Sequence, residues 1–137
     1  MIRSRGAKAD AMRPALYRQR VMPISVVTMI PDALTIHGWR SEARFTPEQL
    51  SQQTFASGDE FIVDFGQHCV GYLSLHCESA GSPPDAPAHL QFIFGEISAE
   101  VAEPFSQYDG WLSRSWLQQE DSYLDVLPVE MTLPRRY

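Results

Sequence analysis

The most constraining feature of the sequence is a series of short apolar or alternating segments, each bounded by turn-forming residues. Apolar and polar positions alternate in several of them, as in a half-buried strand. No stretch has the length and period of a long helix. We therefore predict an all-β fold, an antiparallel β-sandwich of the jelly-roll kind with little helix. The expected strands are residues 24–30, 61–65, 70–77, 90–97, 122–127 and 131–133.

Other local signals are weaker. Thr46, Pro47 and Gln49 have the spacing of a helix start, with Thr46 as the N-cap and Pro47 at the first position. Residues 54–56 are expected to begin another strand before a turn. Residues 98–115 have no clean period, so we expect a long structured loop there.

The length of 137 residues suits one domain, and 44% hydrophobic with 20% charged residues is typical of a globular protein. We expect residues 1–22 to form a loosely ordered basic lead-in and residues 23–137 a single β-sandwich domain. Residues 133–137 look like the start of one more strand. The expectation is therefore a domain cut before its last strand.

The net charge of −6 hides an asymmetry. The first twenty residues hold six basic residues against Asp10, a charge of +5, whereas the other 117 hold five basic and sixteen acidic residues, a charge of −11. An acidic body disfavours nucleic acid as a partner. No segment approaches the roughly 18 apolar residues of a membrane span, so no membrane partner is expected. Without an apolar stretch behind its basic start, the chain is expected in the cytoplasm.

Two cysteines, Cys69 and Cys77, are too few for a disulfide framework, and we expect them to be small buried hydrophobic residues. His68 and His76 lie beside them in the sequence. Their spacing does not match a zinc finger, and a structural zinc site needs four converging ligands. We therefore expect no metal and no cofactor, with the histidines at the surface.

No catalytic motif is present, so no catalytic residue is assigned. Carboxylates are plentiful, and a glycosidase needs two of them about 5 to 10 Å apart across the sugar. A small glycosidase that uses Glu96 or Asp109 is therefore one hypothesis. A solvated acidic surface accounts for the same residues without special geometry.

Aromatic residues gather between 105 and 116. Aromatic faces can stack on a pyranose while polar groups bind its hydroxyls, so this segment is a candidate carbohydrate site. The competing interpretation is that the tryptophans anchor a long loop to the core. The candidate binding residues are Tyr108, Asp109, Trp111, Arg114 and Trp116.

Several short motifs recur in one order along the second half of the chain. The pieces are residues 63–67, 70–73, 94–96, 108–116 and 133–137. In this order they resemble the signature of bacterial α-L-rhamnosidases of glycoside hydrolase family 78. The resemblance covers residues 60–137 well and 17–59 more loosely.

Four residues of this signature have a structural interpretation: Asp64, Gly66, Gly71 and Glu96. Either glycine would permit a positive φ or a close backbone approach, and Asp64 would bind the turn backbone. Glu96 ends a strand. None of these roles requires a catalytic residue.

The resemblance implies that the catalytic groups sit in a separate (α/α)₆ barrel, which is absent from this chain. It therefore implies a non-catalytic module that scaffolds a catalytic domain or chain. A carbohydrate-binding module for rhamnose-containing glycans is the alternative, since some sandwich domains of that family bind sugar.

Overall fold

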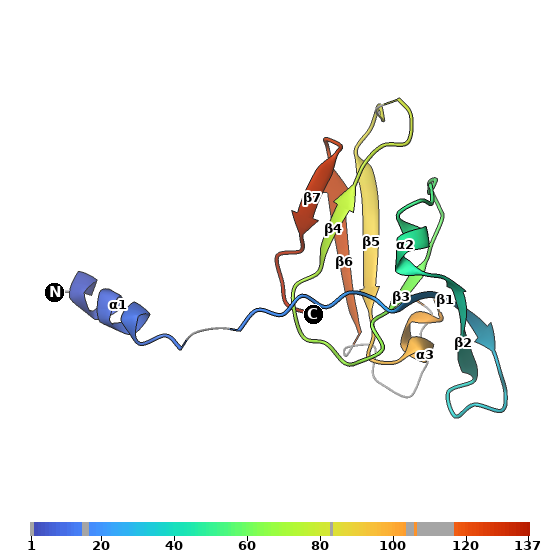
Figure 1. Ribbon diagram of the computed structural model, residues 1–137, viewed down its shortest axis with the longest axis horizontal. Helices are drawn as coiled ribbons and strands as arrows, with labels where there is room; N and C mark the ends of the chain where they lie inside the picture. Colours follow the sequence, from blue (N-terminus) through green and yellow to red (C-terminus); the bar gives the residue numbers. More distant parts are fainter. Residues whose placement is uncertain (1, 15–16, 83, 104–105, 107–116) are drawn as a thin grey trace.

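The computed structural model describes residues 2–14, 17–82, 84–103, 106 and 117–137. Strands dominate it, and the helices are short (Figure 1). The helices are α1 (Ile2–Ala11), α2 (Pro47–Leu50) and α3 (Ser98–Val101). The strands are β1 (Ser25–Pro31), β2 (Trp39–Phe45), β3 (Ile62–Asp64), β4 (Ser74–Cys77), β5 (Ala88–Phe94), β6 (Gln118–Leu124) and β7 (Val129–Thr132).

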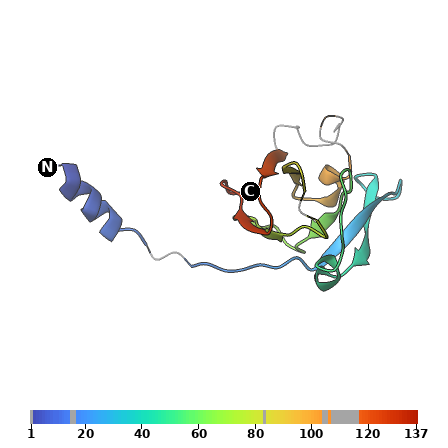
Figure 2. The ribbon, with the colours of Figure 1, turned by 90° about the horizontal axis from the view of Figure 1, so that it is seen from above.

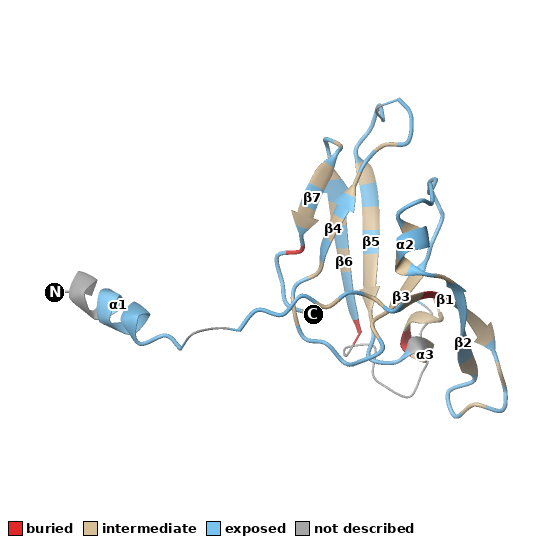
Figure 3. Ribbon diagram, viewed as in Figure 1, coloured by how far each residue is buried: buried red, intermediate tan, exposed pale blue. Residues whose placement is uncertain are grey.

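The strands pair in three antiparallel sheets, ordered β2-β1-β3, β4-β7 and β5-β6. Seen from above, they surround a common interior (Figure 2). This arrangement confirms the predicted antiparallel β-sandwich with little helix. It also places the faces of β5 and β6 that point away from the interior in contact with solvent (Figure 3).

The first sheet is built around β1, whose β-branched residues suit a central strand. Val26 and Val27 are both buried, although consecutive residues of a strand normally point to opposite faces. A break in register explains this: Val26 pairs with Phe45 but Val27 pairs with Ala43, so the β1–β2 ladder is irregular at this point.

The sheet of β5 and β6 shows the predicted alternation. Leu90, Phe92 and Phe94 are half-buried, whereas His89 and Gln91, on either side of Leu90, are exposed. The Phe94 ring also stacks on the Tyr137 ring, with centroids 4.2 Å apart. One face of this sheet therefore belongs to the core and the other to the surface.

Residues 133–137, expected to start a further strand, run alongside residues 71–73. The Leu133 amide donates to the Leu73 carbonyl at 2.9 Å, and Gly71 and Tyr137 exchange two backbone hydrogen bonds of 2.9 Å. The Leu133 side chain is fully buried, with 0% of its surface exposed. This segment thus extends the pairing of β4 with β7 and fills part of the core.

Helix α2 begins as predicted. The Gln49 amide donates to Thr46 Oγ1, the Thr46 amide donates to Gln49 Oε1, and Pro47 occupies the first turn. The prediction of a strand at 54–56 was wrong, because those residues form no ladder. Strand β2 was missed altogether.

The basic lead-in contains helix α1, which lies away from the strands (Figure 1). From residue 6 on, its described side chains are exposed. Its closing turn carries Lys8. The helix therefore gains no packing against the sandwich.

Candidate functional site

The predicted carbohydrate-binding residues, Tyr108, Asp109, Trp111, Arg114 and Trp116, all lie outside the described residues. The chain on either side of them is described. Helix α3 precedes them, and Leu117, which is 6% exposed, follows them immediately before β6. Leu117 therefore fixes the chain to the core at this point.

A buried carboxylate holds the turn between β5 and α3. Glu100 is 2% exposed, and its Oε2 accepts hydrogen bonds from the amides of Glu96 at 2.6 Å and Ile97 at 3.2 Å. A β-carbon on Gly95 would lie 3.0 Å from Glu100 Cβ and Oε2, so a side chain there would press on the carboxylate. Sequence reasoning missed this role of Glu100. The available signal was a Glu in the first turn of a short helix, where it can bind free amides.

Glu96 itself is exposed and lies 3.6 Å from His68 Nε2. Glu100 thus stabilises a turn through its carboxylate, whereas Glu96 faces solvent beside His68. In the described parts of the chain, no group of three or more His, Cys, Asp or Glu is placed to hold a metal ion.

The cysteines differ from the prediction. Cys69 is exposed, so its predicted burial was wrong, and Cys77 is half-buried. Burial raises the pKa of the Cys77 thiol. The difference arises because Cys77 ends β4 with its side chain toward the interior, whereas Cys69 lies in the exposed segment before that strand.

Two of the four signature residues, Asp64 and Gly66, form a turn after β3. Asp64 Oδ1 accepts a hydrogen bond from the Gly66 amide at 2.7 Å, and the Asp64 carbonyl accepts one from Ile24 at 2.7 Å. Gly66 has a φ of 68°, which favours glycine. Gly71 departs from the expectation: a β-carbon there would meet no atom within 4 Å, and its φ is not positive. Its backbone pairing with Tyr137 is its observed contribution.

The outward face of β5 and β6 carries a polar network. Asp121 Oδ1 lies 2.8 Å from His89 Nε2, and the side-chain amides of Gln91 and Gln119 donate to the same carboxylate at 3.3 Å. The hydrogen bond from His89, and then those from Gln119 and Gln91, hold the pKa of Asp121 below its usual value. The His89 ring stacks on Tyr123 with centroids 4.5 Å apart. These cross-strand contacts lock the pairing of the two strands.

A hollow of about 320 Å³ lies between the end of β2 and the loop before β3. The Arg44 guanidinium lies 5.2 Å from the centre of the Phe45 ring. Near the other wall, the rings of Phe55 and Phe61 are 4.7 Å apart. The lining residues are Arg44, Phe45, Gln53, Thr54, Phe55, Gly58, Asp59 and Glu60.

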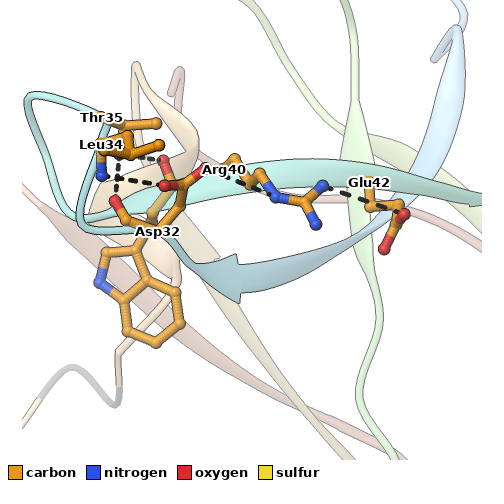
Figure 4. A network of polar contacts seen from close by, with 6 residues as sticks. Asp32, Leu34, Thr35, Arg40 and Glu42 are labelled. Atoms are coloured by element: carbon orange, nitrogen blue, oxygen red, sulfur yellow. Dashed lines mark hydrogen bonds and ion pairs between the residues drawn. The ribbon is translucent and has the colours of Figure 1, made fainter.

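The turn between β1 and β2 is held by a network of polar contacts (Figure 4). The Leu34 amide donates to Asp32 Oδ1 at 2.9 Å, and Thr35 Oγ1 lies 3.0 Å from the carbonyl oxygens of Asp32 and Trp39. Arg40 lies 3.6 Å from Asp32. The turn is therefore fixed by its own side chains.

Comparison with known proteins decides the family. Residues 23–137 match the model of the glycosyl hydrolase family 78 α-rhamnosidase N-terminal domain. The chain belongs to this family. The predicted resemblance, close over residues 60–137 and looser over 17–59, is thus confirmed over residues 23–137.

The chain is also similar to a solved family member, a rhamnosidase from Klebsiella oxytoca with rhamnose bound. The two share 59% sequence identity with a TM-score of 0.82, over 96% of this chain and 26% of that one. The family 78 domain described here thus spans about a quarter of that rhamnosidase. No match was found among curated proteins. Among the described residues, no helix of this domain is long and apolar enough to cross a membrane.

Proposed function

We propose that residues 23–137 form a non-catalytic β-sandwich module that packs against and scaffolds the catalytic part of an α-L-rhamnosidase-type glycoside hydrolase. Two observations carry this proposal: residues 23–137 match a family 78 N-terminal domain, and the chain covers 26% of a 59%-identical rhamnosidase. Most of that rhamnosidase therefore lies outside the matched segment, and this larger part is the proposed partner of the module.

The surface of the chain supports a covering partner. Its accessible area is 11353 Å², against about 7,200 Å² for a compact monomer of this mass. The extended lead-in accounts for part of the excess. Among the described residues, the buried apolar side chains are Val26, Val27, Leu117 and Leu133. So small a core is characteristic of a domain that gains further burial from a neighbour.

The test mixes the full chain with the Klebsiella rhamnosidase from which the matching segment has been removed. We expect the two to form a 1:1 complex by analytical ultracentrifugation. The chain alone is expected to leave an aryl α-L-rhamnoside intact, and its addition is expected to stabilise the larger piece against heat. Failure to associate would overturn the scaffold function. Turnover by the chain alone would instead favour the small glycosidase with Glu96 or Asp109.

A second candidate function is recognition of a rhamnose-containing carbohydrate. The observation that favours it is the bound rhamnose of the Klebsiella protein, together with the aromatic segment of this chain. The residues proposed to bind sugar are Tyr108, Asp109, Trp111, Arg114 and Trp116. Tryptophan fluorescence titrated with L-rhamnose and its oligosaccharides tests it. A saturable change that disappears in Trp111→Ala or Trp116→Ala would support the site, and no change at millimolar sugar would exclude it.

A further inference from the structure

The turn between β1 and β2 presents two apolar side chains that are largely exposed. Leu34 is 96% exposed and Ile36 is 78% exposed. Folding of this domain alone gives these side chains almost no burial. Two neighbouring aliphatic residues at the tip of one hairpin therefore mark a surface that another molecule can cover.

The same turn is held in one shape. Its backbone closes through hydrogen bonds from Asp32 to Gly38 at 2.8 Å, from Thr35 to Asp32 at 3.1 Å and from Gly38 to Thr35 at 3.2 Å. The Asp32 carboxylate and the Thr35 hydroxyl add the side-chain contacts of Figure 4. A turn that is already ordered loses little conformational entropy when it binds, which favours association.

The charges at the base of the turn are already paired. Arg40 lies 3.6 Å from Asp32 and 3.9 Å from Glu42, so its guanidinium is balanced within the hairpin (Figure 4). The tip of the turn, residues 33–36, therefore exposes mainly aliphatic surface. A surface that matches it in chemistry is an apolar depression on a folded protein.

We infer that the tip, residues 33–36, inserts Leu34 and Ile36 into an apolar depression on the glycoside hydrolase part that this module scaffolds. This inference rests on the proposed function and names the surface that it uses. The choice of occupant follows from the comparison: the larger part of the 59%-identical rhamnosidase lies outside the segment that matches this chain. A second copy of this chain is the competing occupant.

The experiment measures binding of the full chain to the Klebsiella rhamnosidase that lacks the matching segment, by isothermal titration calorimetry. The variant is Leu34→Ser with Ile36→Ser. Val126→Ser is the matched control, because Val126 is also an aliphatic residue in an exposed turn, at 74% exposure. We expect the double variant to bind at least about tenfold more weakly, since two buried aliphatic side chains are lost from the interface. The control should bind like the unmodified chain.

The outcomes separate the two proposals. Equal binding of the double variant and the unmodified chain would overturn the docking tip and leave the scaffold function standing. No binding of the unmodified chain would overturn both. A chain that self-associates at micromolar concentration and becomes monomeric in the double variant would assign the tip to a second copy and overturn the inference.

A chimera gives a second measurement if the larger piece does not fold alone. Residues 23–137 replace the matching segment of the Klebsiella rhamnosidase. The double substitution should lower the melting temperature of the chimera and leave that of the isolated chain unchanged. An equal change in both proteins would show that the residues stabilise the hairpin itself and would contradict docking.

Discussion

A β-carbon placed on Gly66 would lie 2.6 Å from Cδ1 of Ile24, closer than non-bonded carbon atoms approach in proteins. The same glycine has a φ of 68°, in the left-handed region. Gly66→Ala therefore combines a backbone penalty of about 1 to 2 kcal/mol with displacement of the Ile24 side chain. We expect a clear loss of unfolding free energy in urea denaturation.

Two other glycines serve as controls for that substitution. Gly38 has a φ of 73° with open space around it, so Gly38→Ala should show the backbone penalty alone. Gly71 has neither feature, so Gly71→Ala should be close to neutral. A Gly66 variant no less stable than the Gly38 variant would show that Ile24 moves aside without cost.

Leu133→Ala should destabilise the domain strongly. The side chain is fully buried and follows the pairing of β7 with β4, so its removal leaves a cavity. Such truncations cost about 2 to 5 kcal/mol. Chemical denaturation of the variant measures the loss, with Val126→Ala, at an exposed position, as the control. A loss no larger than that of the control would show that Leu133 is not part of the core.

Acid should weaken the β5–β6 sheet through Asp121. Its pKa in the folded state is lowered, first by the hydrogen bond from His89, so the ionised form is the one that folding favours. The stabilisation is thus complete above the pKa of the unfolded chain and is lost as the pH falls through the lower folded pKa. Unfolding free energies measured from neutral to acidic pH should fall less steeply in Asp121→Asn than in the unmodified chain. Parallel curves would contradict this contribution.

The two thiols should react at different rates. Cys69 is exposed, whereas Cys77 is half-buried and has a raised pKa. Less of Cys77 is therefore thiolate, the reactive form, and the reagent reaches it less easily. Titration with a disulfide reagent under native conditions should show one fast and one slow thiol, and Cys69→Ser should remove the fast phase. Loss of the slow phase instead would reverse the assignment.

The sequence correctly predicted those helices and strands that are determined by a local pattern of apolar or capping residues. Strands β1 and β5 have such patterns, and the Thr46 capping box depends only on neighbouring residues. Strand β2 was missed because most of its side chains are polar and exposed, so backbone pairing with β1 determines its structure. Strand β6 began earlier than predicted for the same reason, since its polar first residues pair with β5.

The candidate sites could not be predicted from the sequence, because they depend on contacts between residues far apart in the chain. A local sequence pattern does not indicate such contacts. The network around Asp121 joins residues 30 and 32 positions apart. The residue types of Leu34 and Ile36 do not indicate that they are exposed, because their exposure follows from the closed turn that holds them. The family signature was readable because its short motifs keep their order and spacing.

The pairing of β4 with β7 also has a kinetic consequence. Ser74 and Thr132 face each other across this ladder although they are 58 positions apart in the sequence. The antiparallel pair β5–β6 lies within the loop that this ladder closes. Closing a long loop costs entropy before any contact compensates for it, so pairings of this kind form slowly. We expect β5 and β6 to pair first and the β4–β7 ladder to close around them late in folding.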